Sequence, residues 1–186
     1  EVKLRITAKS KTEQEAKQLI IPIEREILRR TGLHCFATEE KSLAAVLIDL
    51  LRERKETLAV AESCTGGGIG ASLTAIPGSS DIFIGGVIAY RNSAKNALLD
   101  VPKKLLQKHG AVSKQVVEAM AKGVLKATEA DWSIAVSGVA GPTGASKSKP
   151  IGLVQFCIAG PKGTRITTET FSPHRKRSEI QKLSVL

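Results

Sequence analysis

Hydrophobic and polar positions change their period several times along the chain, and each change predicts a different element. Residues 2–7 alternate between apolar and polar side chains, and residues 33–37 form a second short apolar run, so both predict strands. Between them, residues 11–30 carry apolar side chains at helical spacing, and Pro22 inside this helix predicts a kink or a restart. Residues 1–38 therefore predict a small β-α-β segment.

From residue 39 to residue 186 the pattern alternates between helices and strands. Helices are expected at 42–53, 69–76, 92–99, 102–109, 113–127 and from about 175, and strands at 58–62, 83–90, 133–139, 151–159 and 164–171. The run 83–90 is apolar throughout, which predicts a central strand buried on both faces, and Gly85-Gly86 inside it predicts a bulge or a close backbone approach. Residues 160–163 are typical of a hairpin turn. The order of elements predicts an α/β fold, a layered α/β/α sandwich with a mixed sheet.

Composition narrows the class of protein. The 186 residues are 42% hydrophobic and 3% aromatic, so we expect one domain with a small appendage and a core of Leu, Ile, Val and Ala. No apolar run is long enough for a membrane helix and no signal peptide opens the chain, which begins at Glu1 and is expected to be a piece of a longer polypeptide. Three scattered cysteines predict neither a disulfide framework nor a zinc site, and they fit a reducing, cytoplasmic compartment.

The net charge of the chain indicates the class of its partners. A formal charge of +10 favours anions, either phosphate-bearing metabolites or nucleic acid. The basic residues are spread along the chain and few aromatic side chains are present to stack on bases. A general basic surface is therefore favoured over a dedicated nucleic-acid groove.

The stretch LAVAESCTGGGIG, residues 58–70, carries the strongest chemical signal. A buried strand is predicted to end at Glu62, and the nucleophilic side chains of Ser63, Cys64 and Thr65 follow it before the glycines and a helix. The first backbone N–H groups of that helix lack internal partners, so they predict an anion or oxyanion site. The stretch is not a Walker loop, a dinucleotide-binding GxGxxG or a GxSxG elbow. The alternative is that Ser and Gly serve only the turn.

Polar side chains stand at the carboxyl ends of three predicted strands. In α/β sheets, ligands bind outside these ends. The three groups are residues 63–65, residues 90–91 with Lys95, and residues 137–138 with the loop 141–144. The histidines support no Ser-His-Asp pattern, which leaves a Ser–Lys pair with Lys95 as the base. Its amine must be partly neutral, which requires a pKa lowered by about 3 pH units through burial or nearby cations. The alternative is a solvated helix lysine.

Five motifs, kept in order and spacing, resemble the C-terminal domain of the CinA family of competence/damage-inducible proteins. They are AESCTGG, IPGSSDIFIGGVIAY followed by N and AK, HGAVS, SGVAGPTG and KPIGLV. The resemblance covers residues from about 42 to the end, and it is to the nicotinamide-nucleotide amidase (PncC-like) group. Residues 1–38 are similar to the small KH-like segment that precedes this domain, so we expect a domain boundary there and the amidase domain at 39–186.

The resemblance implies deamidation of nicotinamide mononucleotide to nicotinate mononucleotide and ammonia, with no metal and no cofactor. It implies that Ser63 is the nucleophile and that Tyr90 and Lys95 hold and deprotonate it. The substrate-binding residues that it implies are Thr65, Gly66, Gly67, Ser137, Gly138, Arg175 and Arg177. Among these, Arg175 is the first candidate for the nucleotide phosphate and Arg177 the second, because Pro173-His174-Arg175 stands where the family has Gly-Asp-Arg.

Two rival functions stand beside the amidase. One is an interaction module that acts in competence or DNA repair, and the other is a regulatory domain that binds nucleotide without turnover. For the amidase we expect nicotinamide mononucleotide as the small-molecule partner and a homo-oligomer as the assembly. We expect no membrane partner and no nucleic acid.

Overall fold

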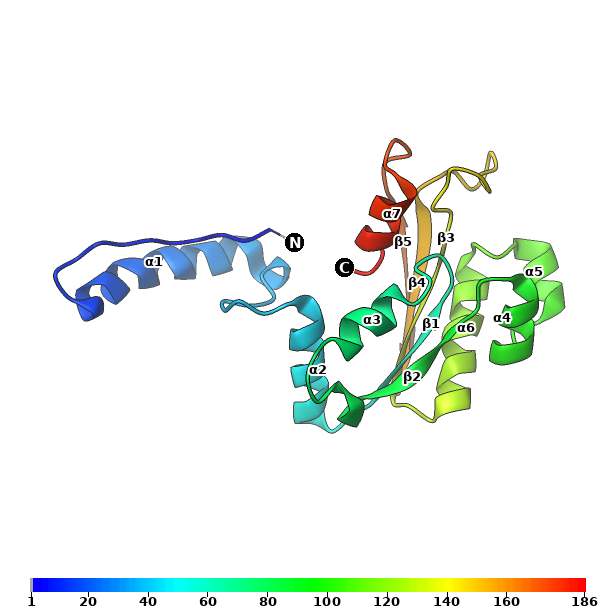
Figure 1. The fold of residues 1–186 in the computed structure, drawn as a ribbon, viewed down its shortest axis with the longest axis horizontal. Coiled ribbons are helices and arrows are strands. Elements are labelled where there is room, and N and C mark those ends of the chain that lie inside the picture. The colour runs from blue at the N-terminus through cyan, green and yellow to red at the C-terminus, as the bar shows by residue number, and fades with distance from the viewer. Residues whose placement is uncertain (1) are drawn as a thin grey trace. The chain divides into compact units, whose positions relative to one another are not determined.

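The computed structural model describes residues 2–186, which form two compact units, one ending at Val46 and one comprising Leu47–Leu186. The C-terminal unit contains a five-stranded sheet of order β2-β1-β3-β4-β5 (Figure 1). Its strands are β1 (Leu58–Glu62), β2 (Phe83–Ile88), β3 (Trp132–Gly138), β4 (Leu153–Gly160) and β5 (Gly163–Thr170). Strands β1, β2 and β3 are parallel, whereas β4 and β5 are antiparallel, so the mixed sheet and its terminal hairpin are confirmed.

Helices cover both faces of this sheet. They are α2 (Leu43–Arg54), α3 (Gly68–Thr74), α4 (Asn92–Leu99), α5 (Lys103–His109), α6 (Lys114–Thr128) and α7 (Arg177–Leu183), with a 3₁₀ turn η2 (Ser79–Asp81). Figure 1 shows α2, α3 and α7 on one side of the sheet and α4, α5 and α6 on the other. The predicted α/β/α sandwich is therefore confirmed.

The main core lies between the sheet and α6. The inward side chains of α6, which include Val117 and Met120, are fully buried against small residues of β1, β3 and β4 such as Ala61 and Ala135. The hydroxyl of Ser113 caps α6 by accepting a hydrogen bond from the Val116 N–H at 3.3 Å. Small residues on the strands allow the helix to pack closely, and a layer of this kind is rigid enough to fix the ends of the strands.

Strand β2 corrects one prediction. It lies at an edge of the sheet, and its outward side chains Ile84 and Ile88 are about half exposed, so it is not a central strand buried on both faces. A continuous apolar run does not distinguish a central strand from an edge strand that leaves one side uncovered. The expected irregularity is present, because the register with β1 shifts after Leu58 and a Cβ on Gly86 would lie 2.4 Å from Val60 Cγ2.

The N-terminal unit corrects a second prediction. Its helix α1 (Glu13–Thr31) runs through Pro22 without a restart, and a 3₁₀ turn η1 (Gly32–His34) follows it. Neither 2–7 nor 33–37 forms a strand. The periodicity is that of a strand, but strand structure also requires a neighbouring strand for the backbone hydrogen bonds, and neither segment pairs with one among residues 2–186.

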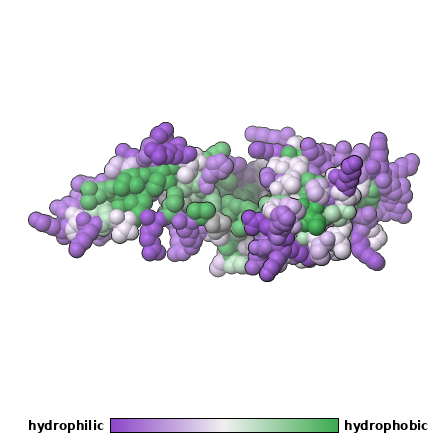
Figure 2. Space-filling model, turned by 90° about the horizontal axis from the view of Figure 1, so that it is seen from above, coloured by the Kyte–Doolittle hydropathy of each residue, from purple (hydrophilic) through white to green (hydrophobic). Residues whose placement is uncertain are grey.

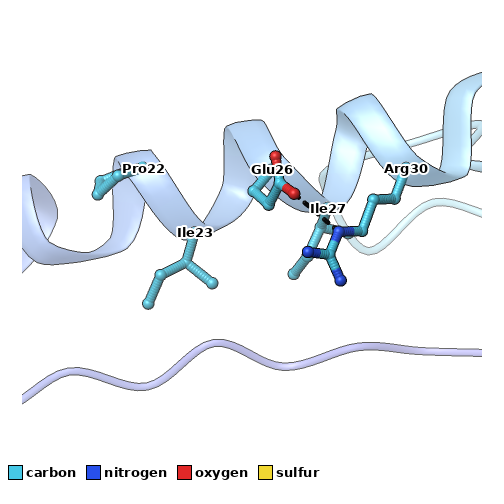
Figure 3. Close-up of a pocket in the computed structure, with 5 residues that line it drawn as sticks. All are labelled: Pro22, Ile23, Glu26, Ile27 and Arg30. Carbon is cyan, nitrogen blue, oxygen red and sulfur yellow. Dashed lines mark hydrogen bonds and ion pairs between the residues drawn. The ribbon is translucent and has the colours of Figure 1, made fainter.

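The N-terminal unit leaves much apolar surface uncovered. No residue of α1 is buried. Figure 2 shows apolar atoms gathered on this unit. Its exposed large apolar side chains are Val2, Leu4, Leu19, Ile21, Ile23, Leu28, Leu33, Phe36 and Leu43. An open pocket of about 410 Å³ lies along α1, lined by Pro22, Ile23, Glu26, Ile27 and Arg30 (Figure 3).

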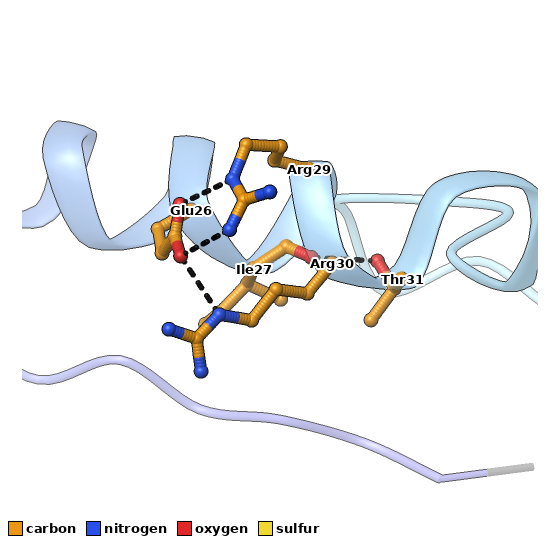
Figure 4. Close-up of polar contacts among 5 residues, drawn as sticks. All are labelled: Glu26, Ile27, Arg29, Arg30 and Thr31. Carbon is orange, nitrogen blue, oxygen red and sulfur yellow. Dashed lines mark hydrogen bonds and ion pairs between the residues drawn. The ribbon is translucent and has the colours of Figure 1, made fainter.

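The charges on α1 pair within the helix. The Glu26 carboxylate accepts hydrogen bonds from Arg29 at 2.7 and 2.8 Å and from Arg30 at 2.7 Å (Figure 4). These hydrogen bonds lower the pKa of Glu26. The Thr31 hydroxyl donates to the Ile27 carbonyl at 2.8 Å. Such surface pairs contribute little stability, and no Ser, Thr, Cys or Lys lines the α1 pocket, so it is not the candidate active site.

Candidate active site

Ser63 stands at the carboxyl end of β1, at the start of the turn that leads into α3. All five residues of β1 are buried. The turn bends sharply at Gly66 and Gly67, whose φ angles of 63° and 102° are in the region that favours glycine. Ser63 is buried, with 8% of its surface exposed. The predicted strand, glycine-rich turn and helix are all confirmed here.

Lys95 meets Ser63 from α4. Its Nζ donates to Ser63 Oγ at 2.9 Å, to the Ala89 carbonyl at 2.7 Å and to the Tyr90 carbonyl at 3.2 Å. The lysine is 1% exposed, so it is not a solvated helix lysine. A neutral amine has two N–H groups and one lone pair. The two carbonyls can accept the two N–H groups, which leaves the lone pair directed at the Ser63 hydroxyl.

Burial prepares Lys95 to act as a base. Desolvation lowers the pKa of Lys95 from its ordinary value of 10.5 to about 8. No carboxylate forms an ion pair with this amine among residues 2–186, so nothing restores the charged form by direct pairing. A fraction of the amine is therefore neutral near pH 7, which is the state that can accept a proton from a serine.

The thiol of Cys64, the residue after Ser63, lies in an environment that makes it unreactive. Cys64 is 4% exposed and packs against Gly138, where an added Cβ would lie 3.1 Å from its sulfur. Burial, with a smaller contribution from the charge of Glu62, raises the pKa of Cys64 to about 11. A thiol with this pKa contains almost no thiolate at neutral pH, so it is a poor nucleophile. The alternative that Cys64 attacks is disfavoured.

Glu62 is a residue of this turn whose contacts sequence reasoning missed. Its carboxylate is 1% exposed and accepts hydrogen bonds from Thr65 Oγ1 at 2.6 Å and from the N–H groups of Gly67, Ile69 and Gly70 at 3.0, 3.1 and 2.8 Å. The start of α3 is therefore already occupied by an anion from the chain itself. The N–H groups of Gly67, Ile69 and Gly70 and the Thr65 hydroxyl, which were expected to face a ligand, donate to this carboxylate instead.

Tyr90 contributes differently from its implied role. Its carbonyl accepts from Lys95, but its side chain is 57% exposed and its hydroxyl accepts a hydrogen bond from Arg177 Nη2 at 2.6 Å. Arg177 Nη1 donates to the Gly141 carbonyl at 2.8 Å. The guanidinium thus joins the segment after β2 to the loop after β3, at the edge of the sheet that carries Ser63.

The remaining predicted binding residues divide into structural and peripheral ones. Ser137 is 1% exposed and its hydroxyl donates to the Ala111 carbonyl at 2.9 Å, so it fixes a loop. Gly138 allows close packing, because a Cβ there would lie 2.7 Å from Val154 Cγ2. Arg175 lies in the exposed turn before α7. Of the two candidate arginines, the structure brings Arg177 and not Arg175 to the strand ends.

Helix α7 and the residues directly after it pack against the turn that follows β1. Gln181 Nε2 donates to the Cys64 carbonyl at 2.8 Å, and a Cβ on Gly68 would lie 2.8 Å from Val185 Cγ2. Gln181 and Glu62 were both missed by sequence reasoning. A charged residue that ends a fully apolar strand before a glycine-rich helix start could have indicated Glu62, because carboxylates satisfy free helix N–H groups. No local signal marks Gln181, which is 117 residues from its partner.

Residues 2–186 contain neither a metal-binding cluster nor a membrane-spanning helix. No group of three or more His, Cys, Asp and Glu side chains is placed to bind a metal ion. No helix there combines the length and apolar character needed to cross a bilayer.

Comparisons with known proteins agree with this architecture. The family model described as "CinA C-terminal domain" matches residues 40–186. A "CinA-like protein" from Prochlorococcus marinus (strain NATL1A) is 58% identical over 186 residues, covering 100% of this chain and 43% of the relative. A "CinA-like protein" from Synechococcus sp. (strain RCC307) is 54% identical over 185 residues, covering 100% and 44%. The chain therefore spans less than half the length of these curated relatives.

Solved structures of CinA proteins share the fold of this chain. The crystal structure of competence/damage inducible protein CihA from Agrobacterium tumefaciens superposes with a TM-score of 0.74 at 37% identity, covering 77% of this chain and 87% of that chain. A CinA superfamily protein from Escherichia coli superposes with a TM-score of 0.74 at 29% identity, covering 77% and 82%. By the family match over most of its length, this chain belongs to the CinA family.

Proposed function

We propose that this chain is a serine amidohydrolase domain that deamidates nicotinamide mononucleotide to nicotinate mononucleotide and ammonia. The observation that supports it most is the buried contact of 2.9 Å between Lys95 Nζ and Ser63 Oγ. A serine hydroxyl is a weak nucleophile until a base takes its proton, and a desolvated lysine can be that base. No name among the relatives specifies this reaction, so the substrate rests on the resemblance of motifs and on chemistry.

The reaction proceeds in two balanced steps. Lys95 takes the Ser63 proton while Oγ attacks the carboxamide carbon, and the tetrahedral intermediate expels the amide nitrogen, which receives the proton from Lys95 and leaves as ammonia. Water then attacks the ester on Ser63 while Lys95 takes one proton from the water. Lys95 returns this proton to the leaving Ser63 Oγ, and the acid product ionises to the carboxylate. The cationic ring of nicotinamide mononucleotide makes its carboxamide electrophilic and therefore suits an oxygen nucleophile.

Arg177 is the residue that we assign to the nucleotide end of the substrate. It is exposed, and two of its N–H groups bind Tyr90 and Gly141, which orients the guanidinium at the strand ends. Arginine binds phosphate through two parallel hydrogen bonds. Arg175 in the adjacent turn adds positive charge to the same segment, and the chain's charge of +10 favours an anionic substrate.

Stoichiometric product release tests the proposal. Purified protein is incubated with nicotinamide mononucleotide at pH 8, with and without a chelator, and ammonia and nicotinate mononucleotide are measured. We expect equal amounts of the two products in both samples and none with Ser63→Ala. Absence of ammonia together with steeply salt-dependent DNA binding would favour the interaction module instead.

A further inference from the structure

The carboxylate of Glu62 is buried directly beside Ser63 in the sequence. It is one of the largest fully buried side chains of the described chain, and it has no cationic partner among the ion pairs of residues 2–186. A buried charge is costly unless donors surround it. Glu62 is surrounded by the Thr65 hydroxyl and by three backbone N–H groups, at 2.6–3.1 Å.

These four hydrogen bonds span the turn that follows the nucleophile. Glu62 directly precedes Ser63, whereas its donors lie three to eight residues beyond it, at positions 65 to 70. The carboxylate therefore fastens both sides of the turn to the end of β1. On the outer side, Gln181 holds the Cys64 carbonyl at 2.8 Å. The turn is thus fixed from within by Glu62 and from outside by α7.

With the turn fixed in this way, its remaining backbone N–H groups differ in whether they have an acceptor. The amides of Gly66 and Gly68 donate within the turn, to the carbonyls of Ser63 and Thr65, each at 3.2 Å. The amides of Cys64 and Thr65 donate to no backbone or side-chain oxygen among residues 2–186, and the Cys64 N–H contacts only its own thiol sulfur, a weak acceptor. An N–H directly after a nucleophilic serine is where hydrolases place an oxyanion donor.

We propose that Glu62 is a positioning residue that pre-sets the oxyanion donors, the amide N–H groups of Cys64 and Thr65, beside Ser63. By binding the N–H groups of the α3 start, the carboxylate removes them from contact with substrate and holds the adjacent amides in one orientation. Donors that are already oriented need no reorganisation when negative charge develops on the substrate oxygen. This inference rests on the proposed serine mechanism but not on the identity of the substrate.

The test uses a substrate-independent probe of Ser63. A fluorophosphonate reacts with an activated serine, and its phosphoryl oxygen occupies the oxyanion site during attack. The second-order labelling rate is measured for the full chain and for Glu62→Gln, normalised to the folded fraction by circular dichroism. Glutamine retains the shape but places an NH₂ against an N–H donor. Since loss of one oxyanion donor costs about 100-fold to 1,000-fold, a displaced donor should lower labelling about 10-fold to 100-fold.

Two controls separate positioning from simple stabilisation. The pH midpoint of labelling should stay near 8 in Glu62→Gln, because Glu62 makes no contact with the Lys95 amine. Glu118→Gln removes a carboxylate of an exposed ion pair with Lys122 on α6 and should label at the wild-type rate. For Glu62→Gln the KM for nicotinamide mononucleotide should change less than twofold while kcat falls.

Each outcome has a distinct meaning. Glu62→Gln labelled at the wild-type rate per folded molecule would overturn the positioning role and leave the amidase proposal intact. Wild-type protein that is labelled at Ser63 in a Glu62-dependent manner but releases no ammonia would support Glu62 and overturn the assigned substrate. Wild-type protein that is not labelled at Ser63 would contradict both.

Discussion

The turn after β1 and the N-terminal helix α1 contrast in how their side chains are satisfied. At this turn, Glu62 and Ser63 are buried, and their side chains are hydrogen-bonded to partners in the turn, in the first turn of α3 and in α4. Along α1 no residue is buried, and the ion pairs of Lys17, Arg29 and Arg30 join side chains three or four residues apart. Buried, fully paired polar groups are expensive to assemble, so their presence in the turn and their absence from α1 locate the chemistry.

Replacing the nucleophile is the most severe way to test this contrast. Ser63→Ala should abolish deamidation, a loss of at least about 1,000-fold in kcat, because no other hydroxyl contacts Lys95. Cys64→Ala should keep most of the activity, since the thiol is buried and protonated. Steady-state kinetics on both variants check this. An inactive Cys64→Ala beside an active Ser63→Ala would transfer the role of nucleophile to the thiol.

Replacing the base should cost almost as much. Lys95→Arg should lower kcat about 100-fold to 10,000-fold, because guanidinium cannot accept a proton at neutral pH. In the wild type, kcat should rise about tenfold per pH unit below pH 8 and level off above it, as the Lys95 amine becomes neutral. An arginine variant with a near-normal rate would reduce Lys95 to an electrostatic role.

The two arginines near α7 provide a smaller and more specific effect. Arg177→Ala should weaken apparent affinity for nicotinamide mononucleotide by about 1.5–3 kcal/mol, on the order of tenfold to a hundredfold, because it removes a charged hydrogen-bonding partner. Arg175→Ala is the matched control and should change KM less. The riboside, which has no phosphate, serves as comparison substrate. Equal losses for nucleotide and riboside would mean that Arg177 supports only Tyr90 and the loop at Gly141.

Lys95 should also make stability depend on pH. Its pKa is about 8 in the folded state and 10.5 ordinarily, so between pH 8 and 10.5 the unfolded state binds more protons. The free energy of unfolding should therefore rise with pH across that window, by at most about 3 kcal/mol from this group. Lys95→Met should lack this rise. Denaturant unfolding of both proteins at pH 7.5, 9 and 10.5 measures the difference, and parallel curves would contradict the burial argument.

Removal of the N-terminal segment should have the smallest effect. All residues of the proposed site lie in the C-terminal unit, and the family match begins at residue 40. Deletion of residues 1–39 should leave kcat and KM for nicotinamide mononucleotide within about twofold of the full chain. A loss of activity with retained fold would show that the N-terminal unit contributes to catalysis.

The sequence predicted an element well where the chain contains both the local signal and the residues that pair with it. The helices predicted from 42 and from 113 are present, each capped by its first serine hydroxyl, and Ser63 after β1 meets Lys95 of α4. The strand-like run 2–7 failed because its periodicity says nothing about a pairing neighbour. The prediction that 83–90 is a central strand was wrong for a related reason. Ile84 and Ile88 are apolar, but in the edge strand β2 they are half exposed.

The candidate site shows the same limit. Ser63 and Lys95 could be predicted, because a nucleophile and a possible base stand at neighbouring strand ends. Glu62 appeared only to end a strand, since its four donors come from a turn whose path is set by φ angles at Gly66 and Gly67. Arg177 donates hydrogen bonds to both Tyr90 and Gly141, which are 87 and 36 residues away in the sequence. No local pattern contains such contacts.

The central claim is that Ser63, activated by Lys95, becomes acylated by the substrate. The most direct measurement is rapid-quench mass spectrometry of the protein mixed with nicotinamide mononucleotide at pH 8, followed by peptide mapping. The account predicts a transient ester of the nicotinate nucleotide on Ser63, formed with one equivalent of ammonia and absent from Lys95→Arg. Turnover without any adduct, or an adduct on Cys64, would contradict it.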